Sequence, residues 1–342
     1  MPELPEVEVL ARHLGPLLKG KQIRGIQVRR AKVLRPTPAT RFRRTLVGAR
    51  FEGVSRRGKY LVFRLRGRGA AGTVTLLGHL GMTGRMYLQP AASRLPLHAT
   101  VVFQLGRCAW IFEDTRHFGR LTLDLAPLQA LGPEPWDTEF TSPYLADALR
   151  RSAQAIKVRL LDQRLVAGVG NIYASEALFR AGIAPRKRAR RLTLAEVERL
   201  RFAIREVLQE AIDFGSTVPL DWPGTTQGDG LFYYGRSANA PDYYAERLRV
   251  YDREGQPCPS CGGPIRRIVQ AARSTYFCPS CQPAAGRPHR GRTESKTDSA
   301  GLGLRCQKVH PGFAPARVRP LGTSHALNPD CAEKPLPSFF GF

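Results

Sequence analysis

The stretch Cys258-Pro-Ser-Cys261-Gly-Gly-Pro-Ile-Arg-Arg-Ile-Val-Gln-Ala-Ala-Arg-Ser-Thr-Tyr-Phe-Cys278-Pro-Ser-Cys281 decides the fold of the C-terminal part of the chain. It contains two Cys-x-x-Cys pairs, and each pair can supply two thiolates from a tight turn. Four thiolates complete a tetrahedral shell with no open position, so the spacing predicts one structural Zn²⁺ ion. A redox dithiol and two surface disulfides are the alternatives.

The segment between the two cysteine pairs predicts a β-hairpin. Apolar and polar residues alternate from Pro264 to Phe277, and Arg273 falls near the expected tip. A basic hairpin tip suits contact with a phosphate, although a solvated surface arginine would give the same pattern.

The charge of the chain indicates a polyanionic partner. The 342 residues include 53 Lys and Arg against 28 Asp and Glu, a formal net charge of +25. Nucleic acid is the first candidate, although ribosomal and membrane-surface proteins are also basic. No apolar run is long enough to span a bilayer, and the acidic, Pro-rich N-terminus is unlike a secretory signal. We therefore expect no membrane association and a reducing, cytoplasmic location, associated with the nucleoid if the source is bacterial.

The first 127 residues predict an α-helix followed by a β-domain. Apolar residues recur at helical spacing after Pro5, with acidic residues in the first turn. Short alternating segments separated by Gly and Arg then predict a β-sandwich or barrel. The expected strands are Gln27 to Leu34, Tyr60 to Leu65, Thr73 to Leu77, Thr100 to Leu105 and Leu121 to Leu125.

The rest of the chain predicts helices, the zinc module and a tail. Helices are expected at Tyr144 to Arg164, at Asn171 to Ala181 and after the capping box Thr193-Leu-Ala-Glu196. The Gly, Pro and Tyr-rich stretch from Gly215 to Glu246 predicts a mobile binding loop.

The overall expectation is a multidomain α+β protein. Its parts are a catalytic β-sandwich domain at 1–127, a linker with the first helix of the next domain at 128–150, a helical domain at 151–247, the zinc finger at 248–282 and a disordered basic tail at 283–342.

The N-terminus carries groups suited to nucleophilic catalysis. Removal of Met1 would expose the secondary amine of Pro2, which is less basic than a lysine amine. Glu3 and Glu6 are three residues apart and fall on one helix face, close enough to move protons for that amine. Plain helix capping gives the same residues, so this pattern alone leaves both readings open.

The string Met1-Pro-Glu-Leu-Pro-Glu-Val-Glu8, joined to the zinc spacing, resembles the formamidopyrimidine-DNA glycosylase and endonuclease VIII family. The resemblance covers residues 1 to 281. It includes Gly58-Lys59-Tyr60, His79-Leu-Gly-Met82, Asp114-Thr-Arg-His-Phe-Gly119, Ile156-Lys157 and Val166-Ala-Gly-Val-Gly-Asn-Ile-Tyr-Ala-Ser-Glu176. The last two segments look like a helix-two-turn-helix element, which the resemblance places in the helical domain.

The resemblance implies a role for each matching residue. Pro2 is expected to be the nucleophile of a glycosylase and strand-cleaving lyase, Glu3 the acid for the sugar ring oxygen, Glu6 a supporting carboxylate and Lys59 a contact to the lesion or its phosphate. Other residues are expected to contact double-stranded damaged DNA. They are His98, Arg116, Lys157, Gly168, Gly170, Asn171 and Arg273.

The resemblance also implies how the damaged nucleotide leaves the duplex. Met82, Arg116 and Phe118 are expected to fill the vacated space, although Met82 and Phe118 alone would more often be core residues. Leu4 and Met82 favour oxidised purines over the oxidised pyrimidines of the endonuclease VIII branch. A monomer is expected. A DNA- or RNA-binding protein without turnover and a zinc-ribbon interaction protein remain the rivals.

Two features depart from the family pattern. His117 stands where an arginine is common, and the stretch from Gly215 to Glu246 matches poorly. The first departure bears on a phosphate contact and the second on substrate choice.

Overall fold

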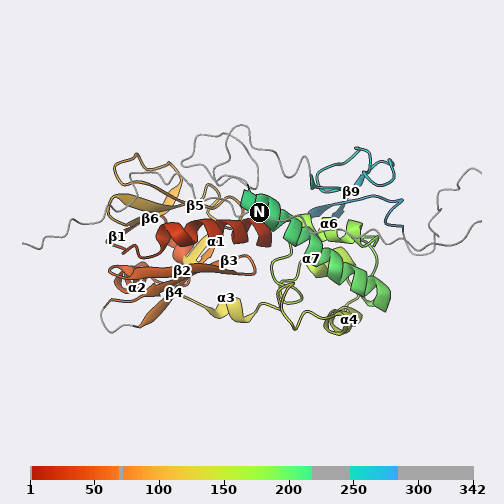
Figure 1. Cartoon of the computed structure of the whole chain (residues 1–342), viewed down its shortest axis with the longest axis horizontal. Helices are drawn as coiled ribbons and strands as arrows, with labels where there is room; N and C mark the ends of the chain where they lie inside the picture. The colour runs from red at the N-terminus through yellow and green to blue at the C-terminus, as the bar shows by residue number, and fades with distance from the viewer. Residues whose placement is uncertain (1, 69–71, 218–246, 284–342) are drawn as a thin grey trace, which may run out of the picture. The chain divides into compact units, whose positions relative to one another are not determined.

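The first helix, α1 (Leu4–Leu18), begins where the sequence places Pro5 and two acids. Glu3 is its N-cap, and the Glu6 carboxylate accepts a hydrogen bond from the Glu3 backbone N–H at 2.7 Å. The apolar face of α1 is buried, packing against a β-strand on one side and a long helix on the other. This helix therefore joins the two halves of the structure (Figure 1).

The computed structural model describes residues 2–68, 72–217 and 247–283, all within one unit of residues 1–287. After α1, the N-terminal half contains β1 (Gly25–Val28), η1 (Ala31–Leu34), α2 (Ala39–Leu46), β2 (Arg50–Arg57), β3 (Tyr60–Arg66), β4 (Thr73–His79), β5 (Arg85–Pro90), β6 (Ala99–Gln104), β7 (Cys108–Glu113) and β8 (Arg120–Thr122). The second half contains α3 (Ala126–Gln129), α4 (Ser142–Arg150), α5 (Ile156–Leu160), α6 (Asn171–Arg180), η2 (Ala189–Arg191), α7 (Leu194–Thr217), β9 (Arg266–Gln270) and β10 (Arg273–Phe277).

The N-terminal half is the expected β-sandwich. One antiparallel sheet has the strand order β1-β6-β7-β5 and the other β2-β3-β4-β8. Aromatic side chains join the two sheets. The ring of Trp110 lies 4.7 Å from that of Phe63 and 5.6 Å from that of Phe51, both in the opposite sheet. Such offset and edge contacts between large buried rings hold the two layers together.

The second half is the expected helical domain. Helix α7 begins with a capping box in which Thr193 and Glu196 exchange backbone-to-side-chain hydrogen bonds. Helices α4, α5, α6 and α7 share one apolar core, and Leu4 of α1 is part of it. The first turn of the N-terminal helix is thus anchored in the helical domain.

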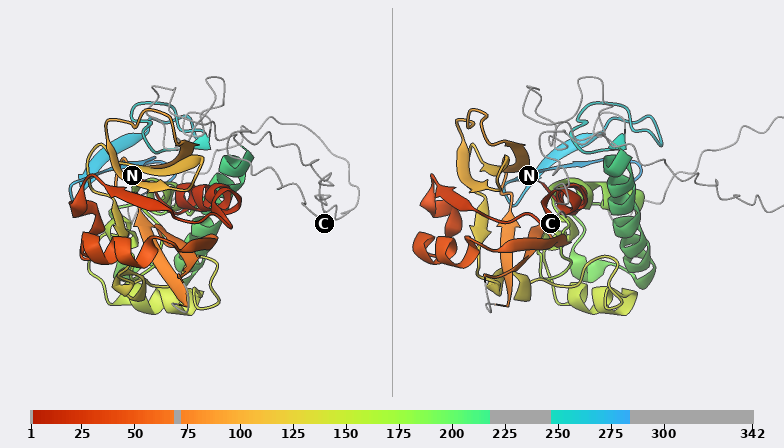
Figure 2. Two further views of the ribbon diagram at one scale, coloured as in Figure 1. Left: turned by 90° about the vertical axis from the view of Figure 1, so that its left-hand side faces the viewer. Right: turned by 60° about the vertical axis from the view of Figure 1, so that its left-hand side comes forward.

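The β9–β10 hairpin packs on α6 and is blue in Figure 2. Gln270 pairs with Arg273, so Ala271 and Ala272 form a two-residue turn. Both alanines have positive φ values, 47° and 57°, as a type I′ turn requires. Alanine is strained in this left-handed region, where Asn and Gly are preferred. The turn sets the position of Arg273, which is exposed.

Three expected elements were wrong in extent. The strand expected from Leu121 to Leu125 is β8, which ends at Thr122, and the next two backbone N–H groups donate to the Thr37 and Thr122 hydroxyls. Strand β1 ends at Val28 because the backbone N–H groups of Arg29 and Arg30 both donate to the Thr100 carbonyl, and the chain then enters a 3₁₀ turn. The single helix expected from Tyr144 to Arg164 is divided into α4 and α5. At the break, backbone groups of residues 152–156 bond to residues 187–190 instead of continuing a helix.

Some expectations fall outside the described residues. They are the tail from residue 284 onward and most of the stretch from Gly215 to Glu246. Among the described residues, no helix is both long and apolar enough to cross a lipid bilayer.

We predict that replacing the turn Ala271-Ala272 by Asn-Gly strengthens the hairpin by about 1 kcal/mol, because left-handed backbone costs alanine roughly 1 kcal/mol per residue. Hydrogen exchange of the β9–β10 amides should slow about fivefold. As a control, Ala148→Gly within α4 should weaken its helix by roughly 1 kcal/mol, since glycine is unfavourable where φ is helical. Unchanged or faster exchange in the Asn-Gly variant would contradict the strain assigned to the turn.

Candidate active site and nucleic-acid interface

The Glu3 carboxylate lies at the N-terminus of α6 and is 1% exposed. Oε1 accepts the Ile172 N–H at 2.9 Å, and Oε2 accepts the Tyr173 N–H at 3.4 Å. Free N–H groups and the helix dipole make a helix N-terminus favourable for an anion. Beside it, the Leu4 N–H donates to the Gly168 carbonyl at 3.1 Å. The residues around Pro2, which is itself buried, are therefore fixed to the helical domain.

The Glu6 carboxylate joins the same cluster. One of its oxygens accepts the Glu3 N–H, and the other accepts the Tyr173 hydroxyl at 2.7 Å. Tyr173 thus contacts both acids, through its backbone and its side chain. Sequence reasoning missed Tyr173, because a tyrosine inside an apolar helix is normally read as core.

Lys59 reaches this cluster from the turn between β2 and β3, where Gly58 has φ +57°. The lysine is only 7% exposed. Burial lowers the pKa of Lys59, and the charges of Glu3 and Glu6 act in the opposite direction. The lysine and the two acids therefore attract one another electrostatically in a site of low polarity.

Gly170 marks the point where these groups meet. A Cβ atom there would lie 2.3 Å from Glu3 Cδ and 2.6 Å from Lys59 Nζ. At Gly168, where φ is +95°, a Cβ would lie 2.4 Å from Leu4 Cδ1. The Gly168 N–H already donates to Gln163 Oε1 at 2.9 Å. Both glycines are thus needed for close approach between the two domains.

Lys157 and Asn171 connect this site to the zinc hairpin. Lys157 is 1% exposed, and its ammonium donates to Asn171 Oδ1 at 3.0 Å and to Ser175 Oγ at 2.9 Å. Burial lowers the pKa of Lys157 to about 8. Asn171 Nδ2 donates to the Ser274 carbonyl at 2.9 Å, next to Arg273. The structure therefore brings Lys157, Asn171 and Arg273 together.

Two loops of the β-sandwich expose large side chains. Met82 is 41% and Phe118 52% exposed, and the Arg116 guanidinium lies 5.2 Å from the Phe118 ring centre. Exposed apolar side chains of this size are typical of binding surfaces. A Cβ at Gly81 would lie 2.5 Å from the Gly119 backbone N, so the loops touch backbone to backbone.

Buried Asp114 fixes the two loops to each other. Its carboxylate accepts hydrogen bonds from the Thr83 hydroxyl at 2.7 Å, from the Arg116 N–H at 3.2 Å and from the Gly119 N–H at 2.7 Å. The His98 carbonyl accepts the Asp114 N–H at 3.0 Å, which places partly buried His98 at the base of the second loop. His117, in the same loop, has φ +56°.

His79 is a second residue that sequence reasoning missed as a side chain of the site. Burial, with the nearby charges of Lys59 and Arg120, lowers its pKa to about 4, so the imidazole is neutral at pH 7. Its Nδ1 accepts the Gly81 N–H at 3.1 Å, which leaves Nε2 to carry the proton. The ring thus supplies a donor beside Lys59 while holding the Met82 loop. A lone histidine at a strand end gives too weak a signal to identify this role.

The four cysteines fit a metal ion. Their sulfur atoms all lie within 4.8 Å of one another, with Cys258–Cys281 at 3.8 Å and Cys261–Cys278 at 3.4 Å. A tetrahedral zinc with Zn–S bonds of about 2.3 Å requires sulfur separations of roughly 3.8 Å. A disulfide requires about 2.05 Å. The geometry therefore agrees with the predicted structural zinc and excludes a disulfide among these four thiols.

Comparisons with known proteins cover most of the chain. Residues 1–121 match the formamidopyrimidine-DNA glycosylase N-terminal domain, residues 131–219 its H2TH domain, and residues 255–284 a zinc finger found in that enzyme and in IleRS. A formamidopyrimidine-DNA glycosylase of Symbiobacterium thermophilum is 44% identical over 83% of this chain and 90% of its own length. One from Thermus thermophilus is 43% identical over 82% of this chain and 98% of its own.

Solved structures agree with these matches. The Lactococcus lactis enzyme, non-covalently bound to DNA containing an abasic site, is 31% identical with a TM-score of 0.70, covering 82% of this chain and all of its own. The structure of the Thermus thermophilus enzyme is 42% identical with a TM-score of 0.68, covering 82% of this chain and 98% of its own.

We predict one zinc ion per chain by elemental analysis and loss of zinc in Cys278→Ser, because a structural site needs all four thiolates. Amides of β9 and β10 should then exchange at least tenfold faster, while those of α7 keep their protection. The control Ser280→Ala, between two ligands but not itself a ligand, should retain its zinc. Full zinc occupancy in Cys278→Ser would rule out the four-thiolate site.

Proposed function

Because the chain belongs to the formamidopyrimidine-DNA glycosylase family, we propose that it excises oxidised bases from double-stranded DNA and cleaves the strand at the resulting site. The observation that carries the mechanism is the convergence on Gly170 of Lys59 and of Glu3, the residue that follows Pro2 in the chain. The proposed nucleophile Pro2, the acid Glu3 and the cation Lys59 thus lie together. Lys59 comes from a segment that is distant from the other two in the sequence. The chain acts on DNA as a monomer.

In the proposed reaction, the Pro2 amine, freed by removal of Met1, attacks C1′ of the damaged nucleotide. The new N–C1′ bond displaces the base, while Glu3 protonates the ring oxygen and opens the sugar. The resulting iminium acidifies the C2′ proton. Loss of that proton expels the 3′ phosphate, and a second elimination expels the 5′ phosphate. Glu6, bonded to the Glu3 N–H and to Tyr173, exchanges protons with the amine.

The remaining site residues bind the DNA backbone in this proposal. Lys59 approaches the lesion or its phosphate, and Asn171 and Arg273 lie where the helical domain meets the zinc hairpin. Buried Lys157 supports this surface by holding Asn171. Gly168, Gly170, Arg116 and His98 complete the set of DNA-binding residues.

Met82, Arg116 and Phe118 fill the space that the damaged nucleotide leaves. This proposed role is supported by the exposure of Met82 and Phe118 on loops that Asp114 holds in place. Met82 and Phe118 act as wedges, and the arginine bonds the orphaned base. Leu4 and Met82 favour 8-oxoguanine and formamidopyrimidines, and oxidised pyrimidines are the alternative class.

We propose that the chain is divided as the sequence indicated, at 1–127, 128–150, 151–247, 248–282 and 283–342. The family matches at 1–121, 131–219 and 255–284 support this division. A cytoplasmic location, with the chromosomal DNA, is part of the same proposal. It agrees with four thiols that stay reduced to bind zinc.

We predict that borohydride traps a covalent adduct between the protein and a duplex containing 8-oxoguanine. The DNA should be attached to the N-terminal peptide that begins at Pro2. Glu3→Gln should slow excision of 8-oxoguanine at least 100-fold, because the ring oxygen loses its acid. It should leave substantial cleavage of a preformed abasic site. Gel mobility and peptide mass mapping provide the measurements.

A duplex with guanine in place of 8-oxoguanine and a protein with an uncleaved N-terminal tag are the controls, and neither should give an adduct. Binding without an adduct would favour the noncatalytic alternative. Equal loss of both steps in Glu3→Gln would contradict the proton role of Glu3.

We predict that Gly170→Ala abolishes excision and lowers the melting temperature by several degrees, while the protein still folds. The added Cβ would collide with the ends of two side chains, Glu3 and Lys59, and would break the hydrogen bonds of Glu3 to α6 without opening the apolar core. Moving them displaces the acid and the cation, which should lower the single-turnover rate at least 100-fold. Gly15→Ala, where no heavy atom lies within 4 Å, is the matched control and should keep its activity. Normal turnover by Gly170→Ala would show that this convergence is not needed.

A further inference from the structure

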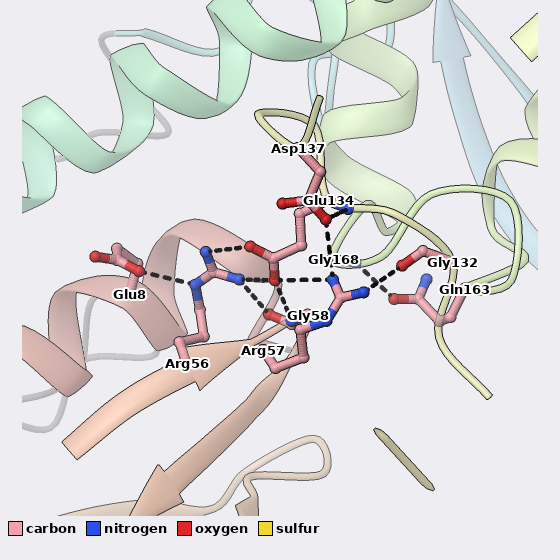
Figure 3. A network of polar contacts seen from close by, with 9 residues as sticks. All are labelled: Glu8, Arg56, Arg57, Gly58, Gly132, Glu134, Asp137, Gln163 and Gly168. Carbon is pink, nitrogen blue, oxygen red and sulfur yellow. Dashed lines mark hydrogen bonds and ion pairs between the residues drawn. The ribbon is translucent and has the colours of Figure 1, made fainter. Parts of the chain in front are cut away.

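The segment connecting the two domains holds an ionic cluster against the Lys59 turn (Figure 3). Glu134 accepts hydrogen bonds from Arg56 on both carboxylate oxygens, one at 3.0 Å, and from the Gly58 backbone N–H. Arg56 also donates to Glu8 of α1 at 2.9 Å. The residue immediately before Lys59 is therefore bonded directly to a side chain of the connecting segment.

The cluster is largely shielded from water. The side chains of Arg56 and Glu134 are 6% and 13% exposed. A bidentate arginine–carboxylate pair in such surroundings fixes geometry more strictly than a surface pair does. Arg57 adds a hydrogen bond to the Gly132 carbonyl at 2.7 Å. The connecting segment is thus bonded to three consecutive residues, 56 to 58, of the turn that presents Lys59.

The same segment is bonded to the stretch that leads into the 168–171 turn, which faces Glu3. The Gly132 N–H donates to the Gln163 carbonyl and the Ala167 N–H to the Pro133 carbonyl, each at 2.9 Å. Gln163 in turn holds the Gly168 N–H and the Val169 carbonyl. Residues 132–134 are therefore hydrogen-bonded both to the Lys59 turn and to the segment that leads into the 168–171 turn.

We propose that Glu134 is a positioning residue that sets the place of the Lys59 ammonium relative to Glu3. Lys59 belongs to the β-sandwich, whereas the Glu3 carboxylate is hydrogen-bonded to the helical domain. The lysine side chain cannot by itself hold the backbone of its turn in place. Glu134 fixes that backbone through the Gly58 N–H and through Arg56. The inference rests on the proposed function, in which Lys59 acts at the lesion or its phosphate.

A purely stabilising ion pair predicts a different pattern of rates. If Glu134 acts through Lys59, its loss matters only while Lys59 is present, so the two mutations are not additive. If Glu134 only stabilises the fold, its loss lowers the rate by the same factor in either background. A double-mutant cycle separates the two cases.

The experiment measures single-turnover excision from an 8-oxoguanine duplex at saturating enzyme for wild type, Glu134→Ala, Lys59→Ala and the double variant. We expect Glu134→Ala to slow excision about 10- to 100-fold, the range that a small misplacement produces. In the Lys59→Ala background, the same change should slow it less than about twofold. Glu134→Gln keeps acceptor oxygen without charge and should lie between. It replaces Glu134→Ala in the cycle if the alanine variant does not fold.

Glu52→Ala is the matched control. Glu52 of β2 pairs with Arg66 of β3 at 3.0 Å, and these are the two strands that the Lys59 turn connects. This ion pair is far more exposed than the Arg56–Glu134 pair. Its loss should change the rate less than about twofold. The proposal is overturned if Glu134→Ala behaves like Glu52→Ala, or if it slows the Lys59→Ala enzyme by the same factor as the wild type.

A second readout does not depend on turnover. Acetic anhydride labelling at pH 8, followed by peptide mass mapping, reports the accessibility of each lysine amine. Glu134→Ala should raise labelling of Lys59 at least threefold and leave Lys157, which is also buried, unchanged. An equal rise at both lysines, or at neither, overturns the positioning role. A wild-type enzyme inactive on 8-oxoguanine would instead refute the proposed lesion class, and the labelling result would still test Glu134.

Discussion

The two hydrogen bonds that hold the Glu3 carboxylate at the N-terminus of α6 are the constraint on which the rest of the structure depends. The acid caps the first helix of one domain, and the N–H groups belong to the other domain. Because Leu4 is packed in the helical core and bonded to the Gly168 carbonyl, the chain end cannot move independently of that domain. In the proposed reaction the nucleophile is a backbone amine, which has no side chain to orient it. The fixed first turn of α1 therefore determines the position and orientation of this amine.

Helix α6 also organises the proposed DNA-binding surface. Buried Glu176 accepts three consecutive backbone N–H groups from Arg249, Val250 and Tyr251, at 2.8 to 3.0 Å. These bonds offset part of the cost of burial, which itself raises the pKa of Glu176. With Asn171 bonded to the Ser274 carbonyl, they tie the zinc module to α6. One helix thus holds the acid at its end and the zinc hairpin along its side.

Much of this arrangement could be predicted from the sequence, and the missing part has a common cause. The cysteine spacing predicted the zinc site, and local alternation predicted strands such as β3 and β6. Strand β2 was missed because three arginines and a glycine hide its alternation, and the break between α4 and α5 was missed because its hydrogen-bond partners lie more than 30 residues away. Tyr173 and Glu134 were missed for the same reason. Their importance comes from partners that only the fold brings near, and sequence patterns contain only local information.

The central claim is that the freed Pro2 amine reacts while Glu3 stays bound to α6. A crystal structure of the borohydride-trapped complex with damaged DNA tests it most directly. The account predicts continuous density from the Pro2 nitrogen to C1′ of an extruded nucleotide, with the Glu3 carboxylate still within hydrogen-bonding distance of the Ile172 and Tyr173 N–H groups. A bond to another amine, such as that of Lys59, or a Glu3 carboxylate released from α6, would contradict it.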